Sequence, residues 1–265
     1  LIIQASYGCP HNSCRFCGMY KSVRYRERDR ADLFREIEKL GRAAPGTARV
    51  FLADGDVMHL PFDRLREILE WLNQAFPRLA RVNLYANGSS ILAKSDDELR
   101  GLRELKLNTL YMGLESGDEE LLRMFAKSET AAGMMEAGRR ARERGLKCSV
   151  MVLLGLGGRA LSERHARATA EALNKMQPAI LSALRFIEVP GTTPPEGHQT
   201  LTEHEAVSEL RMMIEGLDLK KTVFRANHTS SPAPIGGRFP QDKAKLLAEL
   251  DELLATITAH VERLT

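Results

Sequence analysis

Short apolar segments alternate with amphipathic segments along most of the chain. Six apolar segments have the character of β-strands, at residues 2–6, 49–53, 81–85, 109–114, 147–154 and 180–189. Between them a three- and four-residue periodicity predicts helices at 31–40, 62–76, 96–105, 118–144 and 163–176. One helix carries a single apolar stripe of Leu65, Ile68, Leu69 and Leu72. Ser95 followed by Glu98 predicts a capping box at the start of another.

Repeats of a strand and a helix indicate parallel strands joined by right-handed crossovers. After the sixth strand the pattern becomes less regular. We expect a Pro-rich loop at 190–195, a helix near 203–215, a short apolar run at 222–226 and an amphipathic helix from 241 to about 264. Because an eighth strand is missing, the α/β pattern favours a partial (β/α)6-type TIM barrel over a closed one. A doubly wound open sheet is the alternative.

The same pattern predicts the domain organisation. We expect a barrel core at residues 1–195 and a C-terminal extension at 196–265 that ends in a long helix and packs on the core as one structural unit. The chain has 265 residues, 43% of them hydrophobic and 28% charged, a composition that excludes extensive disorder.

The net charge and the length of the apolar runs limit the kinds of partner that the sequence indicates. The net charge of +3 is too small to indicate a nucleic acid partner. Basic residues gather at 21–30 and 139–147, and we interpret both groups as solvated faces, although they leave an anionic substrate open. The longest apolar run, 150–154, is far too short to span a membrane. Four cysteines, three of them in one tight group, favour a reducing, cytoplasmic setting.

The three grouped cysteines, Cys9, Cys14 and Cys17, directly follow the first predicted strand. Three thiolates in one loop predict a metal site with one coordination position left for another ligand. A zinc site with His11 or a more distant residue as fourth ligand is the alternative. Zinc sites usually combine two short ligand pairs, and this chain has no second pair, so the loop favours an iron–sulfur cluster. Cys148 lies within a predicted strand and is interpreted as a core residue.

This C-x4-C-x2-C loop, with Phe16 before its last cysteine, resembles that of the radical S-adenosylmethionine (SAM) superfamily, where the first spacing is usually three residues. It is also similar to a group of small radical SAM enzymes with a C-x2-N-x-C-x-F-C-x-M-Y-K stretch. The resemblance implies that Cys9, Cys14 and Cys17 bind a [4Fe–4S] cluster whose fourth iron chelates SAM. An external reductant of the flavodoxin or ferredoxin type would then allow SAM to be split into a 5′-deoxyadenosyl or related radical.

Further cofactor contacts are expected at the carboxyl ends of later strands, where α/β enzymes collect reactive groups. The Asp54-Gly55-Asp56 segment could be a tight turn. The resemblance implies instead that it hydrogen-bonds the methionine ammonium of SAM through one of its two carboxylates. Asn87 is a weaker candidate, because Asn-Gly is first of all a turn signal.

Two more strand ends complete the expected cofactor site. Glu115 and Ser116 either cap the following helix or, by the resemblance, contact the ribose hydroxyls or the methionine part of SAM. Leu154 and Gly155, at the end of the fifth strand, are expected by resemblance to pack near the adenine.

Four residues of the sixth strand and the tail are candidate catalytic residues facing a substrate cavity: Glu188, Arg225, Asn227 and His228. An ordinary loop histidine is an equal interpretation of His228. The resemblance implies a radical enzyme acting on an unidentified substrate, by oxidoreduction, rearrangement or lysis, methyl transfer or RNA modification. Without a further cysteine cluster, sulfur insertion and peptide maturation are disfavoured. A non-catalytic, zinc-stabilised binding module is the alternative from another class.

Overall fold

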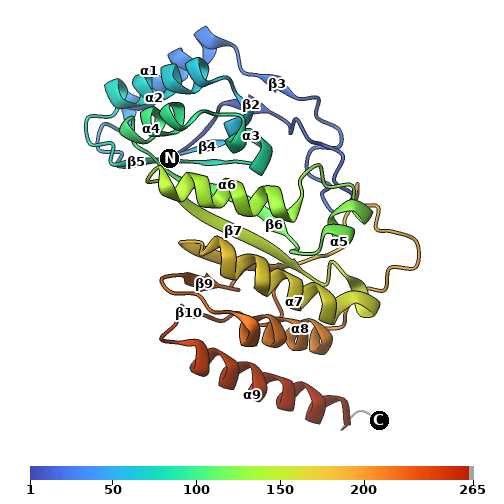
Figure 1. The fold of residues 1–265 in the computed structure, drawn as a ribbon. Coiled ribbons are helices and arrows are strands. Elements are labelled where there is room, and N and C mark those ends of the chain that lie inside the picture. The colour runs from blue at the N-terminus through green and yellow to red at the C-terminus, as the bar shows by residue number, and fades with distance from the viewer. Residues whose placement is uncertain (263–265) are drawn as a thin grey trace. The chain divides into compact units, whose positions relative to one another are not determined.

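The computed structural model describes residues 1–262, with side chains to residue 257 (Figure 1). They divide into two compact units. The first comprises residues 1–12, 19–112 and 136–148, and the second comprises 13–18, 113–135 and the chain from 149 onward. The strands follow the order β1-β4-β5-β6-β7-β8-β9-β10, and the chain passes between the units within β6 (Leu107–Glu115) and β7 (Lys147–Leu154).

In the first unit, parallel strands are joined by helices. Strands β1 (Ile2–Gln4), β4 (Arg49–Ala53), β5 (Arg81–Tyr85) and β6 pair in that order. A separate antiparallel pair joins β2 (Ser6–Tyr7) to β3 (Arg26–Glu27). The helices are α1 (Arg30–Ala43), η1 (Val57–His59), α2 (Phe62–Ala75), α3 (Gly88–Leu92) and α4 (Asp96–Glu104), with most of α6 (Ala131–Glu143).

The two faces of these strands differ. One face is buried and aliphatic, as in Val50, Leu52, Val82 and Leu84, and the predicted α2 stripe is buried as well. The alternate residues are only half-buried, and Phe51, Tyr85 and Tyr111 meet there with ring centroids 4.9 to 6.1 Å apart. Each fully buried aliphatic side chain contributes about 1.5–3 kcal/mol relative to exposure, so the aliphatic face holds the unit together. The half-buried face with the three aromatic rings is not needed for this core and can contact a ligand or other residues.

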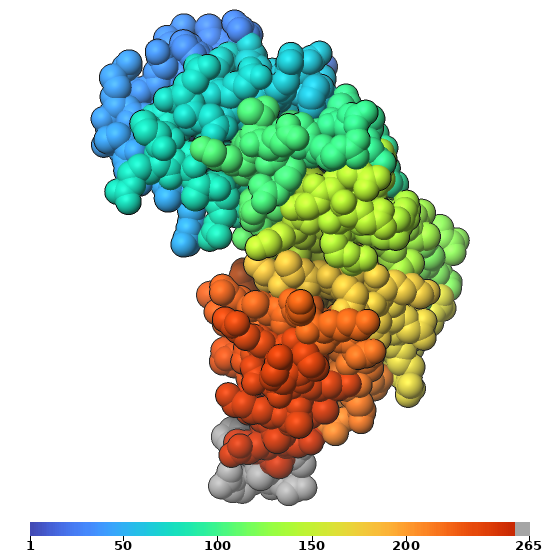
Figure 2. All heavy atoms as spheres, turned by 60° about the vertical axis from the view of Figure 1, so that its left-hand side comes forward, coloured from blue at the N-terminus to red at the C-terminus, as the bar shows by residue number. Residues whose placement is uncertain are grey.

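In the second unit, β7, β8 (Ile180–Arg185) and β9 (Val223–Arg225) are parallel, and β10 (Gly236–Arg238) runs antiparallel to β9. Its helices are α5 (Glu119–Met124), α7 (Gly158–Met176), α8 (Glu203–Gly216) and α9 (Lys243–Glu262). Helix α8 packs against α7 and α9, and Figures 1 and 2 show α8 in orange beside α9 in red. The expected end of the last helix near residue 264, and the side chain of Val261, lie outside the described part.

The predicted fold class is confirmed: an α/β fold with a mostly parallel sheet that, among the described residues, does not close into a barrel. The predicted capping box of Ser95 and Glu98 is present at the start of α4. The proposed domain division at residue 195 stays a prediction. Within residues 1–262 we find no helix that combines the length and the apolar character needed to cross a bilayer.

Four predicted elements were wrong in extent, one of them the helix expected at 163–176, which begins at Gly158. The helix expected at 118–144 is two helices, α5 and α6, because the chain leaves helical geometry after Met124 and Ala126 adopts φ +51°. The strand expected at 180–189 ends at Arg185, and a loop containing Gly191 at φ +92° follows. The first strand is interrupted at Ala5 and continues as the short β2.

Candidate metal and cofactor site

The first unit holds the start of the cysteine loop against the carboxyl end of β4. The Gly8 N–H donates to Asp54 Oδ2 over 3.0 Å, and the Gly55 N–H donates to the Gly8 carbonyl over 3.2 Å. The approach is so close that a Cβ on Gly55 would lie 2.6 Å from the Cys9 Cβ. Glycine at position 55 is therefore required by the backbone of the loop itself, as well as leaving room for a ligand.

The same Asp54 also fixes the far end of the loop. The Tyr20 hydroxyl donates to Asp54 Oδ1, and burial together with this carboxylate raises the pKa of Tyr20 well above its usual value. The Asn12 side chain donates to the Tyr20 carbonyl over 2.5 Å, and Lys21 Nζ donates to the Asn12 carbonyl over 2.9 Å. Tyr20 was not predicted as a site residue, although it belongs to the M-Y-K part of the motif.

Asp56 is a fully buried anchor beneath this loop. Its carboxylate accepts from the Asn87 backbone N–H over 3.2 Å and from the Ser90 hydroxyl over 2.7 Å, and it lies 2.9 Å from His11 Nε2. Asn87 begins the short helix α3, and its side chain makes no capping bond there. The turn that we considered at Asn87 is therefore a helix start, held by Asp56 through the backbone.

His11, Asp56 and His59 form a small group whose ligand-type atoms lie within 4.8 Å of one another. The His11 and His59 rings meet edge to face, with centroids 5.7 Å apart. Among the described residues, His11 is engaged with Asp56. The His11 side chain that the zinc alternative would use is thus bonded to a buried carboxylate.

In the second unit, Cys14, Phe16 and Cys17 lie on the turn that separates α5 from α6. The Arg15 N–H donates to the Phe125 carbonyl over 2.8 Å, and the Ser13 hydroxyl donates to the Ala126 carbonyl over 3.0 Å. The Phe16 ring packs 6.2 Å from that of Phe125. Cys9, Cys14 and Cys17 form no disulfide bond and are half-buried, whereas Cys148 is a buried core residue as expected.

Glu115 ends β6 in a left-handed conformation, with φ +64°. Its carboxyl folds back over Gly113, where a Cβ would lie 2.0 Å from Oε1. Burial raises the pKa of Glu115, and the positive charge of Lys127 opposes that rise. Lys127 also lies over the Phe16 ring, with Nζ 5.8 Å from the centroid. Sequence reasoning missed Lys127 because it placed this residue in the middle of a helix.

Ser116 is fully buried among protein partners. Its hydroxyl lies 2.8 Å from His165 Nδ1 and accepts from the Asp118 N–H over 3.0 Å. The cap of α5 is Asp118, which accepts from the N–H groups of Glu120 and Leu121. Neither Glu115 nor Ser116 is therefore the capping residue that one of our two interpretations required.

The end of β7 carries Leu154, which is buried, and Gly155, which has φ +79°. The Gly155 N–H donates to Glu209 Oε1 over 2.6 Å. Glu209 and His165, two buried polar residues near the expected adenine contacts, carry no signal in the sequence that distinguishes them from other helical residues.

The candidate catalytic residues are exposed on the second unit. Arg225 and Asn227 line one open hollow of about 420 Å³ on the paired strands β9 and β10, but Glu188 and His228 are not in its lining. Glu188 accepts from the Thr200 hydroxyl over 3.1 Å, and His228 Nδ1 lies 2.7 Å from the Ser230 hydroxyl. The structure thus brings two of the four together, and the catalytic role of all four stays a prediction.

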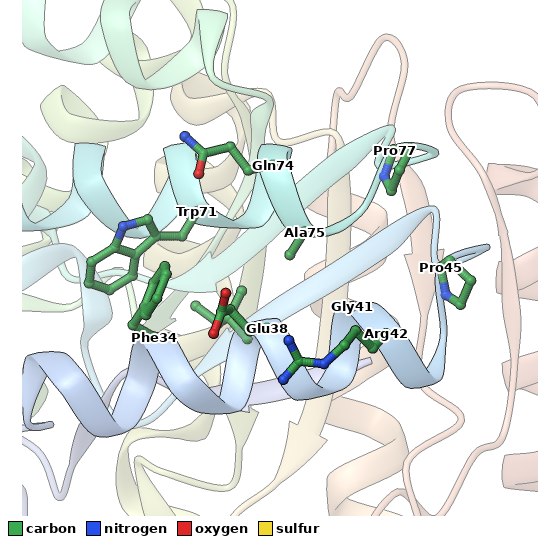
Figure 3. A pocket seen from close by; sticks show the side chains of 10 residues that line it. Phe34, Glu38, Gly41, Arg42, Pro45, Trp71, Gln74, Ala75 and Pro77 are labelled. Atoms are coloured by element: carbon green, nitrogen blue, oxygen red, sulfur yellow. The ribbon is translucent and has the colours of Figure 1, made fainter.

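A second hollow, of about 390 Å³, lies between α1 and α2 (Figure 3). The rings of Phe34 and Trp71 meet in it with centroids 5.0 Å apart, and Pro45 and Pro77 also line it. These prolines precede β4 and β5, so the hollow lies at the amino ends of the strands. Asp54 and Asn87 lie at the carboxyl ends, and the hollow takes no part in the candidate site.

The fold is shared with solved enzyme structures. Methylornithine synthase (PylB) is 20% identical, with a TM-score of 0.61 over 94% of this chain. Coproporphyrinogen III oxidase (HemN) from Escherichia coli, a radical SAM enzyme, is 16% identical, with a TM-score of 0.64 over 81%. The methyltransferase TsrM from Kitasatospora setae, solved with cobalamin and a [4Fe–4S] cluster, is 22% identical, with a TM-score of 0.57 over 69%. This chain spans 68%, 51% and 36% of their respective lengths.

Sequence comparison is more specific about the family than these structural likenesses, which show the fold alone. No curated protein sequence matches the chain. The sequence profile of the Radical SAM superfamily matches residues 3–172, a stretch that contains the cysteine loop and strands β1 to β7. The chain therefore belongs to the radical SAM superfamily, whose enzymes use a [4Fe–4S] cluster and SAM.

Proposed function

We propose that this chain is a radical SAM enzyme in which Cys9, Cys14 and Cys17 hold the cluster. The observation that carries the proposal is that the loop with these three thiols, none of them in a disulfide, is held at Gly8 by Asp54 and at Arg15 by the Phe125 carbonyl. Three thiolates suit a [4Fe–4S] cluster that keeps one iron for a ligand other than the protein. A structural zinc site needs a fourth ligand, and His11 is engaged with Asp56.

When bound by Cys9, Cys14 and Cys17, a [4Fe–4S] cluster together with SAM would supply the radical chemistry that is typical of this superfamily. The protein has to bind and orient SAM and exclude water from it. An external reductant of the flavodoxin or ferredoxin type would supply the electron.

Asp54 is the carboxylate that we assign to the methionine ammonium of SAM. A carboxylate offers about four acceptor positions. Asp56 is fully buried and has three partners, whereas Asp54 is half-buried and has two, the Gly8 N–H and the Tyr20 hydroxyl. Asp54 therefore keeps more capacity to accept from a ligand, and Asp56 supports the loop and α3 from below.

Lys127 is the cation that we assign to the methionine carboxylate. It lies over Phe16, between two of the proposed cluster ligands in the sequence, and its charge acts on Glu115. Pairing an ammonium with a carboxylate in a half-buried setting gives a short, strong hydrogen bond. Glu115 would accept from the ribose hydroxyls, and the backbone of Leu154 and Gly155 would pack against the adenine.

Arg225 and Asn227, which share one hollow, support an anionic or amide-bearing substrate. Methyl transfer and RNA modification remain alternatives within the same enzyme class, as do oxidoreduction and rearrangement.

Anaerobic reconstitution tests the proposal. The protein should bind four irons per chain, show the electron paramagnetic resonance signal of a reduced cluster, and release 5′-deoxyadenosine or a related fragment from SAM with a low-potential reductant. Cys14→Ala should abolish cluster binding, whereas Cys148→Ala, the matched control in the core of β7, should keep it. A colourless protein with one zinc per chain and no SAM cleavage would contradict the proposal.

A further inference from the structure

Two strand ends of the second unit have the same unusual backbone. Glu115 at the end of β6 and Gly155 at the end of β7 both adopt left-handed conformations, with φ +64° and +79°. For glutamate this conformation is unfavourable, so surrounding contacts must hold it. These are also the two strand ends to which the proposed function assigns the ribose and the adenine.

A buried glutamate holds the second of these turns. Glu209, in α8, is 1% exposed, and its Oε1 accepts from the Gly155 N–H over 2.6 Å. Its other oxygen accepts from the Ser162 hydroxyl over 2.5 Å. A hydrogen bond from a backbone N–H to a buried carboxylate is among the stronger ones in proteins, so Glu209 fixes where the chain turns after β7.

A buried histidine holds the first turn. His165, in α7, is 0% exposed, and its Nε2 lies 3.0 Å from the Leu153 carbonyl. Because a carbonyl can only accept, Nε2 donates this bond, and Nδ1 shares a second hydrogen bond with the Ser116 hydroxyl at 2.8 Å. Ser116 directly follows Glu115, so this bond fixes the residue that leaves the left-handed turn.

The two side chains that hold these turns, Glu209 and His165, lie next to each other. Glu209 Oε1 lies 3.7 Å from His165 Nε2, and both side chains are fully enclosed. One buried pair therefore ties the end of β6 to the end of β7. Its acidic member comes from α8, beyond residue 172, where the match to the family profile ends.

We infer that Glu209 and His165 are positioning residues for SAM, and that the C-terminal segment carrying α8 completes the cofactor site. The inference rests on the proposed function. It gives α8 a task in cofactor binding in addition to the packing of α8 between α7 and α9. It also predicts that SAM affinity depends more on the length of the Glu209 side chain, which lets it accept from the Gly155 N–H, than on its negative charge.

Two variants separate reach from charge. Glu209→Gln keeps an oxygen at the same distance from Gly155 and loses the charge, whereas Glu209→Asp keeps the charge and is one methylene too short. We expect Glu209→Asp to weaken SAM binding about tenfold, as the loss of one hydrogen bond to a charged group would. Glu209→Gln should stay within about threefold of the wild type, which is the rescue that a positional role predicts.

Thr222→Val is the matched control. Thr222 is 2% exposed, and its hydroxyl donates to the Pro178 carbonyl over 2.6 Å at the opposite, amino-terminal side of β8 and β9. This change should lower the melting temperature and leave SAM affinity unchanged. Binding is measured by equilibrium dialysis of SAM with reconstituted protein, beside iron content and melting temperature for every variant.

The possible outcomes separate the two claims. A wild-type protein that carries a cluster and binds no SAM overturns the proposed function. If the wild type binds SAM and Glu209→Asp binds it as tightly, the inference is wrong and the proposed function stands. Weakening in Glu209→Gln that equals that in Glu209→Asp also overturns it, because a side chain with the same reach would then fail to restore affinity. If Glu209→Asp fails to fold, hydrogen exchange on the wild type decides: SAM must slow exchange in both 114–118 and 153–158.

Discussion

Replacing Gly55 with alanine tests how closely the cysteine loop is built onto β4. A Cβ at this position would lie 2.6 Å from the Cys9 Cβ and 3.0 Å from both the Cys9 Cα and the Gly8 carbonyl oxygen. Ordinary carbon–carbon contacts begin near 3.5 Å, so Cys9 or Gly55 must move by about 1 Å. Two of the three clashing atoms belong to the backbone, and no side-chain rotation relieves them.

The magnitude follows from this displacement. Overpacking of this kind usually costs about 1–3 kcal/mol. In a chain of this size, each kcal/mol lowers the melting temperature by about 2–4 °C. The same movement lengthens the Gly8 to Asp54 and Gly55 to Gly8 hydrogen bonds, now 3.0 and 3.2 Å, and takes Cys9 out of position. Cluster loading should therefore fall by more than the loss of stability alone would explain.

The assay compares Gly55→Ala with Gly46→Ala, a glycine whose added Cβ would meet nothing within 4 Å. Melting temperature is measured on cluster-free protein, and iron is counted after anaerobic reconstitution well below the melting temperature. We expect Gly46→Ala to match the wild type in both. Equal iron content in the two variants would show that Cys9 binds the cluster without its close contact with the end of β4. That result would refute the link between Gly55 and cluster loading.

Three other predictions each concern the behaviour of one side chain. In cluster-free protein at pH 8, three thiols should react rapidly with a disulfide reagent and Cys148 only after unfolding, because burial raises the pKa of its thiol to about 12; a fourth rapid thiol would contradict this. Hydrogen bonds from Arg144 and Arg140 hold the pKa of Asp96 at about 2, below its usual 3.8, so its contribution to stability is present above pH 4 and is lost as the pH falls toward 2. The urea midpoints of wild type and Asp96→Asn should therefore differ at pH 7 and converge near pH 2, and a constant difference would exclude this ion pair as the cause. Lys127→Met should weaken SAM binding about tenfold, whereas Lys147→Met, at an exposed position, should not; equal affinities would remove Lys127 from the site.

The sequence predicted the strand–helix alternation and the site elements that depend on local pattern. The α2 stripe is buried and the capping box at Ser95 is formed, because both follow from residues within a few positions of one another. The carboxyl ends of the strands also carry the expected residues, since parallel connectivity alone places them there.

Roles that depend on contacts distant in sequence could not be predicted. Ser116 was expected either to cap the following helix or to touch the cofactor, and nothing in the sequence indicated that its hydroxyl is bonded to His165, 49 residues away. Gly155 depends on Glu209, 54 residues away and in another helix. Neither partner stands out by residue type, because buried histidines and glutamates are recognised only by what surrounds them.

The helix wrongly predicted at 118–144 shows how hydrogen bonds to the cysteine loop can replace those of a regular helix. Leu121, Leu122 and Phe125 continue the helical spacing, and periodicity alone therefore extends α5. In an uninterrupted helix, however, the carbonyls of Phe125 and Ala126 would accept from N–H groups four residues on. Here they accept from Arg15 and Ser13 of the cysteine loop. The helix has to end for the loop to dock, and the same break brings Lys127 over Phe16. A departure from regular pattern beside a reactive loop is thus informative about function, because it identifies backbone groups that the site uses instead of the helix.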